Sequence, residues 1–320
     1  MSVSPDPVVS IVVPAYNHGA YLREAIDSIL GQDYPHVELI VIDDGSTDGT
    51  KQILASYGNR FHWESQSNQG QVATLNRAWT KSRGDVLGYL SADDVLLPDA
   101  VGAAVRCLEQ NPDAVLTYSD FNQIDPHSAV VRRVTTPEFD YRTMAVKFVC
   151  PPGPGAFFRR SAIAKAGFWD TELRQMLDYD YWLRLGLCGR FIRIPTVLAA
   201  YRVHPDSQTF ASSSQIRAEE PVTIVRRFFD RSDVPGDIRM FRNQALGNAH
   251  LQSASLYFRT GNPFSGIREM GRAFLLWPLN LFTLRTLKLF FNVIFYRTGH
   301  RVLWLCRAVL KKLTGKYLRA

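Results

Sequence analysis

The feature that most constrains this chain is the alternation of short apolar runs with helix-like segments over its first 110 residues. Residues 8–13 form an apolar run that Pro14 ends, and residues 21–32 then repeat apolar side chains at helical spacing. The same pattern predicts strands at 37–42, 61–64 and 86–90, and helices at 50–57, 71–82 and 98–110. Because strands that alternate with helices pair in parallel and are buried on both faces, we expect an α/β fold with a mostly parallel sheet.

The chain changes character near residue 205. Strand-like sequence continues at 114–121, 130–135 and 191–201, and residues 178–188 have helical spacing. Beyond Ser207 the strand signal disappears, and five further segments are expected to be helices: 216–230, 238–260, 264–277, 279–296 and 300–313. The predicted domains are therefore an α/β domain over residues 1–210 and a helical, basic, amphipathic region over residues 211–320.

Charge is distributed unevenly along the chain. Of the 37 Lys and Arg residues, 12 lie from Arg259 onward, where Glu269 is the one acid, so the preceding part has 25 basic and 29 acidic residues. Large apolar residues stand between these cations, namely Trp277, Phe290, Phe291, Phe295, Trp304 and Leu305. Two interpretations stay open: amphipathic helices on an anionic membrane surface, or helices packed on the α/β domain with a solvated basic face.

Other partners and locations are less compatible with the sequence. No uninterrupted apolar stretch reaches the ~20 residues of a spanning helix, and nucleic acid is disfavoured because the neighbours of the cations are aliphatic and aromatic. The first seven residues do not resemble a secretory signal, so a cytoplasmic location at the inner face of the cell membrane is expected. Four widely spaced cysteines predict reduced thiols, and the oligomeric state has no sequence signal.

Two acidic clusters directly follow predicted strands. Asp43 and Asp44 come after residues 37–42, and Asp93 and Asp94 come after residues 86–90. In open α/β sheets, ligands bind beyond the carboxyl ends of the strands, and oxygen ligands suit Mg²⁺ or Mn²⁺ on a diphosphate. Taken singly, each cluster is also typical of a turn or a helix cap: Asp48 for the helix after it, and the second cluster for a helix beginning near Pro98.

In combination, these motifs resemble glycosyltransferase family 2. The resemblance covers residues 8 to about 205 and rests on Val9 to Asn17, Ile40 to Gly49 and Leu90 to Asp94, with Asn68 to Gln71 and Leu75 to Arg77 between them. It implies the GT-A fold, with a nucleotide-binding half over about 1–120 and an acceptor-binding half over about 121–210. It also implies metal-assisted, inverting transfer from a nucleotide-sugar donor to a glycan or lipid-linked acceptor.

The resemblance assigns roles by position. Pro14, Ala15 and Tyr16 would line the nucleoside pocket, and Asp44 would accept a hydrogen bond from the base, which favours uracil. Ser91, Ala92 and Asp93 would contact the donor, although Ser91 stands where the family often has aspartate. The divalent metal, Mg²⁺ or Mn²⁺, would be held by Asp93, Asp94 and His204, and Arg202 would offset charge on the leaving diphosphate. A lone histidine is also commonly structural.

A third motif extends from Leu177 to Arg184. By resemblance Asp178 is the general base and Asp180 the alternative, although Leu177 replaces the family's preceding glutamate. Inversion needs a carboxylate that takes the proton of the acceptor hydroxyl, and an aspartate with a pKa near ~4 is ionised at neutral pH. The same acids are also what the first turn of a helix favours.

The sequence is compatible with three classes of function. A transferase is favoured over a catalytically silent nucleotide-sugar-binding module because Asp44, Asp93 and Asp178 are all present. A basic nucleic-acid-binding or scaffold protein is third. A dehydrogenase is disfavoured because the first strand lacks a following Gly-x-Gly-x-x-Gly. The Gln-x-x-Arg-Trp motif of processive family members is absent, so transfer of a single sugar is expected.

Overall fold

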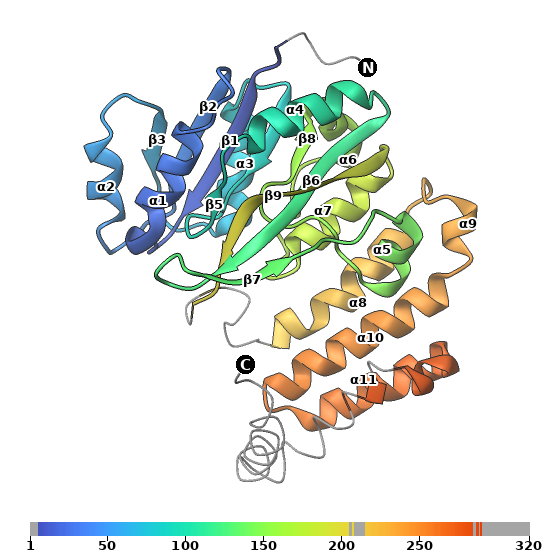
Figure 1. Cartoon of the computed structure of the whole chain (residues 1–320). Coiled ribbons are helices and arrows are strands. Elements are labelled where there is room, and N and C mark those ends of the chain that lie inside the picture. The colour runs from blue at the N-terminus through green and yellow to red at the C-terminus, as the bar shows by residue number, and fades with distance from the viewer. Residues whose placement is uncertain (1–5, 205–206, 208–214, 284–285, 288, 290–320) are drawn as a thin grey trace, which may run out of the picture. The chain divides into compact units, whose positions relative to one another are not determined.

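The computed structural model describes residues 6–204, 207, 215–283, 286–287 and 289 (Figure 1). The chain divides into two compact units. The first comprises Met1–Ala211 and Arg227–Ile238, and the second comprises Ser212–Arg226 and Arg239–Ala320. The first unit thus includes residues 227–238, which the sequence groups with the helical region. Arg227 belongs there because its guanidinium binds Asp170 and Glu172.

A mixed sheet of nine strands organises the first unit, with β7 beside β6 and the order β3-β2-β1-β4-β8-β6-β9-β5. Four strands that the alternation predicts are parallel neighbours: β1 (Val9–Ala15), β2 (Val37–Asp43), β3 (His62–Ser65) and β4 (Val86–Tyr89). The others are β5 (Val95–Leu96), β6 (Ala114–Ile124), β7 (Val130–Val134), β8 (Phe157–Arg159) and β9 (Arg190–Arg202). β8 is antiparallel to both β4 and β6, so the sheet is mostly rather than wholly parallel.

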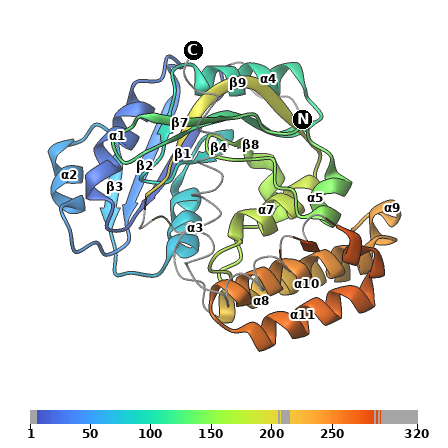
Figure 2. The ribbon, with the colours of Figure 1, turned by 60° about the horizontal axis from the view of Figure 1, so that its bottom comes forward.

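Helices cover both faces of this sheet, as the continuous apolar strands require (Figure 2). On one face, α1 (Gly19–Leu30), α2 (Thr50–Ser56) and α4 (Ala100–Gln110) share a core with Val9, Ile11 and Val13. On the other face, α3 (Gln71–Lys81) and α7 (Leu177–Gly186) pack against the sheet and each other through aromatic side chains. Trp79 of α3 contacts Phe158 and Tyr181 at centroid distances of 4.9 and 5.4 Å. The expected α/β architecture is confirmed.

The second unit is helical. α10 (Arg242–Arg259) and α11 (Pro263–Leu276) pack through Leu251, Ala254 and Met270. The first part of α8 (Gln215–Asp230) joins them, because Tyr257 of α10 donates a hydrogen bond to Glu219 at 3.0 Å. A short 3-10 helix, η2, follows over Pro278–Phe282. Among the described residues, no helix is both long and apolar enough to cross a membrane.

Some local predictions were wrong. The single helix expected over 238–260 is two, α9 (Gly236–Arg239) and α10, because the apolar spacing continues across the break through buried Ile238 and Ala245. The helix expected from Leu279 begins as η2 instead, while most of its remainder and the segment 300–313 lie outside the described residues. Short elements had no periodic signal, namely β5, α5 (Tyr141–Lys147), η1 (Arg160–Ala162) and α6 (Ile163–Ala166).

Candidate active site

The carboxyl ends of β1, β2 and β4 lie at one edge of the sheet. β1 and β2 are paired in register from Val9 with Val37 to Ala15 with Asp43. The Asp44 N–H extends this pairing by donating to the Ala15 carbonyl at 2.8 Å, and the Leu90 N–H donates to the Val12 carbonyl at 3.0 Å. The residues that follow these strands, including Tyr16, Asp44 and Asp93, therefore come from neighbouring strand ends.

The residues predicted to bind the nucleoside differ in exposure. Ala15 is buried, Pro14 is half-buried, and Tyr16 is 45% exposed. Asp44 is buried, and its carboxylate accepts hydrogen bonds from the backbone N–H groups of Gln69 and Gly70, both at 2.8 Å. These bonds fix the carboxylate, and they explain why Asn68 to Gln71 accompanies the Asp44 motif. Contact between Asp44 and a base stays a prediction.

Two other acids in this motif shape turns. Asp43 accepts a hydrogen bond from the Ser46 N–H at 3.0 Å, which closes the turn. Asp48 accepts from the Thr50 N–H at 3.0 Å and from the Gly19 N–H at 2.9 Å. It therefore binds the first residues of both α2 and α1. The Asp43 bond supports the turn interpretation, and Asp48 binds the start of α2, although the N-cap residue of that helix is Gly49.

Gly45 allows the loops after β2 and β3 to approach closely. Its φ is +79°, and a Cβ there would lie 2.8 Å from the Asn68 nitrogen. Gly45→Ala should strain this turn at a cost of about 1–3 kcal/mol, lowering the melting temperature and weakening nucleotide binding. Gly271→Ala is the control because a Cβ there meets nothing within 4 Å. Equal melting curves and nucleotide affinities for the wild type and Gly45→Ala would contradict this account.

Asp93 lies beside two histidines. The Nε2 atom of His204, which follows β9, is 2.9 Å from the Asp93 Oδ2 atom. His18 Nε2 is 3.8 Å from the same oxygen. One ligand atom from each of these three residues lies within 4.8 Å of the others, so the group has the spacing of a metal site. Sequence reasoning identified Asp93 and His204 but missed His18, although His18 lies three residues beyond the end of β1 at the same sheet edge.

Asp94 has a different environment from Asp93. It is buried, and its Oδ1 atom accepts a hydrogen bond from the Arg202 backbone N–H at 2.9 Å. Burial and the adjacent Asp93 carboxylate raise the pKa of Asp94 well above its usual value. Asp94 is not in the three-residue group. The helix-cap interpretation of the pair is wrong, because the N-cap residue of α4 is Asp99.

Arg202 is fully buried, and its guanidinium is engaged within the protein. It donates to the backbone carbonyls of Asp93 at 2.8 Å and Asp125 at 3.0 Å, and to the carboxylate of Glu24 at 2.6 Å. A fourth bond goes to the Ser128 hydroxyl. Direct donor binding by Arg202 stays a prediction, whereas the observed bonds favour a role in positioning the Asp93 loop. Ala92 in that loop is buried and Ser91 is half-buried.

Asp178 lies in the first turn of α7. Burial raises the pKa of its carboxyl, so a proton binds there more readily than on an ordinary aspartate. Tyr89, at the end of β4, is close enough to this carboxyl to respond to its charge. The pKa of the Tyr89 phenol is raised well above its usual value by burial and by the nearby charges of Asp178 and Asp94. The fold thus brings the third motif to the same edge as the acidic clusters.

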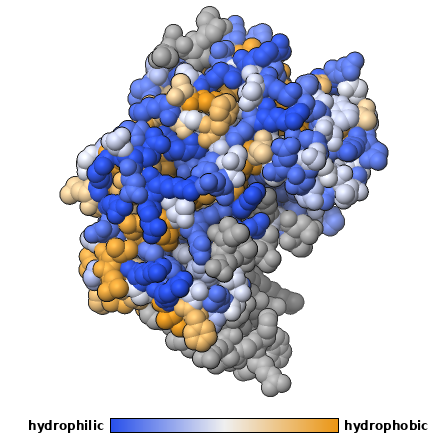
Figure 3. Space-filling view, turned by 180° about the vertical axis from the view of Figure 1, so that it is seen from behind, coloured by the Kyte–Doolittle hydropathy of each residue, from blue (hydrophilic) through white to orange (hydrophobic). Residues whose placement is uncertain are grey.

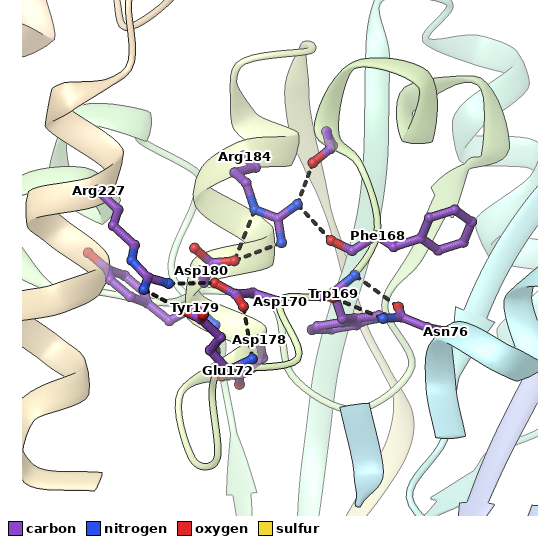
Figure 4. Close-up of polar contacts among 11 residues, drawn as sticks. Asn76, Phe168, Trp169, Asp170, Glu172, Asp178, Tyr179, Asp180, Arg184 and Arg227 are labelled. Atoms are coloured by element: carbon purple, nitrogen blue, oxygen red, sulfur yellow. Dashed lines mark hydrogen bonds and ion pairs between the residues drawn. The ribbon is translucent and has the colours of Figure 1, made fainter. Parts of the chain in front are cut away.

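Asp180 is one half of a buried ion pair (Figure 4). Its Oδ2 atom accepts hydrogen bonds from the Arg184 Nη2 at 2.7 Å and Nε at 2.9 Å. Burial raises the pKa of Asp180, and the charge of Arg184 opposes that rise. Arg184 also donates to the Phe168 carbonyl at 2.9 Å. Through Arg184, Asp180 therefore links α7 to the preceding loop. Within the described part of the chain, Asp178 has no such ion pair.

Further hydrogen bonds and ion pairs fix the loop before α7 (Figure 4). The Asn76 side chain both donates to the Trp169 carbonyl at 2.9 Å and accepts from the Trp169 N–H at 3.0 Å. Arg227 binds Asp170 at 2.9 Å and Glu172 at 2.5 Å. The Leu75 to Arg77 motif thus contributes to the site indirectly, by fixing the loop that leads to Asp178.

Comparison with known proteins supports the resemblance to glycosyltransferase family 2. The model of glycosyl transferase family 2 matches residues 10–167. An uncharacterized glycosyltransferase of Rickettsia typhi is 30% identical over 228 residues, which are 67% of this chain and 70% of that protein. The hyaluronan synthase of Pasteurella multocida is 26% identical over 235 residues, covering 71% of this chain and 24% of the synthase.

Solved structures show the same GT-A fold. S. aureus TarS 1–349 has a TM-score of 0.63 at 19% identity, and the match covers 86% of this chain and 82% of that one. The mannosyltransferase PcManGT from Pyrobaculum calidifontis, in complex with GDP-Man and Mn²⁺, has a TM-score of 0.60 at 19% identity, with 91% and 88% covered. Together with the sequence relatives, these matches confirm the predicted relationship: the chain belongs to glycosyltransferase family 2.

Proposed function

We propose that this glycosyltransferase moves one sugar from a UDP-sugar to a glycan or lipid-linked acceptor, with inversion and with Asp178 as general base. The observation that carries the proposal is the arrangement of three acids. Asp44 follows β2 and Asp93 follows β4, the strands on either side of β1, and the charges of Asp178 and Asp94 both act on Tyr89. A donor that extends from Asp44 to Asp93 would place its sugar toward the carboxylate of Asp178.

The reaction divides between these residues. Pro14, Ala15, Tyr16 and Asp44 would hold the nucleoside, and Asp93 with His204 would hold the metal. When bound, Mg²⁺ or Mn²⁺ supplies positive charge to the diphosphate leaving group. Asp178 would take the proton of the acceptor hydroxyl while that oxygen attacks the anomeric carbon from the side opposite the diphosphate. The raised pKa of Asp178 makes it a better proton acceptor than an ordinary aspartate.

The choice of uridine rests on Asp44. A carboxylate can accept a hydrogen bond from the imino N–H of uracil, which cytosine lacks. TarS has been solved with UDP-GlcNAc and PcManGT with GDP-Man, so the structural neighbours bind different bases. Calorimetric titration of the full chain with UDP, CDP and GDP should give the highest affinity for UDP. Tighter binding of CDP or GDP would contradict the uridine assignment, and no binding of any of them would contradict the donor site.

We also infer peripheral association of the helical unit with an anionic membrane surface. α11 and η2 expose large apolar side chains: Phe264 at 85%, Ile267 at 57%, Leu275 at 86%, Leu279 at 60% and Phe282 at 82%. Figure 3 shows hydrophobic patches on an otherwise mostly hydrophilic surface. A cavity of about 540 Å³ in this unit combines two arginines and a histidine with leucines: Arg226, His250, Arg272, Leu275 and Leu276. Phe290, Phe291, Phe295, Trp304 and Leu305 lie outside the described residues.

The full chain should therefore co-sediment with vesicles that contain anionic lipid. Each Lys or Arg near the surface contributes about 1 kcal/mol, and high salt should weaken but not abolish binding, because apolar contacts are not screened. Replacing both Leu275 and Phe282 with serine should reduce the bound fraction, whereas Met240→Ser, at another exposed position, should not. Failure of the full chain to bind anionic vesicles at low salt would contradict membrane association.

A further inference from the structure

Three loops from different strands bring His18, Asp93 and His204 together. His18 follows β1 and is the N-cap residue of α1, Asp93 follows β4, and His204 follows β9. We infer that His18 is a third protein ligand of the divalent metal, and that the resulting set of two imidazoles and one carboxylate selects Mn²⁺ over Mg²⁺. The inference rests on the proposed function, because that function places a metal at Asp93 and His204.

The distances fit a shared ion better than a set of hydrogen bonds. His204 Nε2 lies 2.9 Å from the Asp93 Oδ2 atom, so a hydrogen bond explains that contact. His18 Nε2 is 3.8 Å from the same oxygen, which is too long for a hydrogen bond. A common ion at about 2.0–2.2 Å from each ligand atom would explain why both rings converge on Asp93.

The two imidazole rings are also largely buried without a full set of hydrogen bonds. The His204 side chain is 2% exposed and that of His18 is 26% exposed. The Nδ1 atoms of both rings are buried, and neither has a hydrogen-bond partner within the described parts of the chain. Two imidazoles placed this way around one carboxylate gain little from each other. A metal ion bound by both Nε2 atoms and by the Asp93 carboxylate would give the two rings a common partner on the side that faces Asp93.

The ligand types decide which metal is favoured. Mg²⁺ prefers oxygen ligands and keeps several waters, whereas imidazole binds Mn²⁺ and later transition metals more strongly. Asp94 would make the site richer in oxygen, but its Oδ1 atom binds the Arg202 N–H and it is not in the three-residue group. His18 in place of Asp94 therefore shifts the preference of the site from Mg²⁺ toward Mn²⁺.

Metal binding to the full chain without donor tests this inference separately from activity. Calorimetry should give a higher affinity for Mn²⁺ than for Mg²⁺, and His18→Ala should weaken Mn²⁺ binding at least ~10-fold, because even loss of an outer-shell partner costs that much. Mg²⁺ binding should change less. His36→Ala, at an exposed histidine, is the matched control. His18→Asp should restore metal binding with a preference shifted toward Mg²⁺.

Pulsed EPR of bound Mn²⁺ in the wild type should detect hyperfine coupling to two imidazole nitrogens, and His18→Ala should leave one. The test does not depend on the folding of a variant, because the wild type alone must show coupling to two imidazole nitrogens. One nitrogen in the wild type, or unchanged Mn²⁺ affinity in His18→Ala, would overturn the inference. If Mn²⁺ binds through His18 but no nucleoside diphosphate binds, the proposed function fails instead.

Discussion

Asp178→Asn is expected to lower the rate of sugar transfer by about 10²-fold or more while leaving the affinity for the UDP-sugar nearly unchanged. Asparagine keeps the volume of the side chain but cannot take a proton from the acceptor hydroxyl. Asp178 belongs to α7, whereas the predicted nucleoside contacts lie at the carboxyl ends of β1 and β2, so the substitution should spare donor binding. Single-turnover rates and calorimetric affinities for the same donor measure the two effects separately.

Asp180→Asn is the matched control, one carboxyl further along α7. Its carboxylate holds Arg184 in a pair whose side chains are 11% and 13% exposed. Removing one partner of a buried pair costs up to about 3–5 kcal/mol, so this variant should melt at a lower temperature while keeping more of the rate. If Asp180→Asn instead abolishes transfer with an unchanged melting temperature, Asp180 is the base and the assignment of Asp178 is wrong.

The pKa of Asp178 also gives the direction of the pH dependence. A general base acts in its deprotonated form, and burial raises the pKa of this carboxyl above the ordinary aspartate value. The transfer rate should therefore rise with pH, and its acidic limb should lie above the ~4 of an unperturbed aspartate. In Asp178→Asn the residual rate should lose this limb. An unchanged limb in the variant would assign it to another group.

Removal of the divalent metal is expected to abolish transfer. Charge stabilisation by a metal is worth several kcal/mol in the transition state, which corresponds to at least ~10²-fold in rate. EDTA should eliminate activity, and added Mn²⁺ should restore it. Asp93→Ala should reproduce the loss without restoration by metal, because Asp93 is the proposed oxygen ligand and lies beside His18 and His204. Melting curves must show that Asp93→Ala is folded, and full activity in metal-free buffer would contradict the metal assignment.

The sequence predicts the first half of the fold well because its elements are local and strongly patterned. β1 to β4 and α1 to α4 each have a continuous apolar run or a helical repeat within the chain itself. The antiparallel insertion of β8 between β4 and β6 depends on pairing between residues far apart, such as Val86 with Arg159. β5 is two residues long, which is too short for any period to appear.

In the candidate site, too, the locally patterned features could be predicted, and those that depend on residues far apart in the chain could not. The acids were found because motifs directly follow predicted strands, and the family resemblance gives them roles. The burial of Arg202 could not be predicted, because its partners Asp93 and Glu24 are 109 and 178 residues away in the chain. His18 was missed for a related reason. A single histidine has no pattern of its own, and its proximity to Asp93 depends on the pairing of β1 with β4.

The central claim is that the chain turns over a nucleotide sugar rather than only binding it. The most direct measurement is UDP released from a UDP-sugar by the full chain with Mn²⁺ and a panel of glycan and lipid-linked acceptors, compared with Asp178→Asn under the same conditions. We expect repeated turnover by the wild type, and donor binding without comparable release by the variant. If the wild type binds the UDP-sugar but releases UDP no faster than Asp178→Asn, the chain is a nucleotide-sugar-binding module and the account is contradicted.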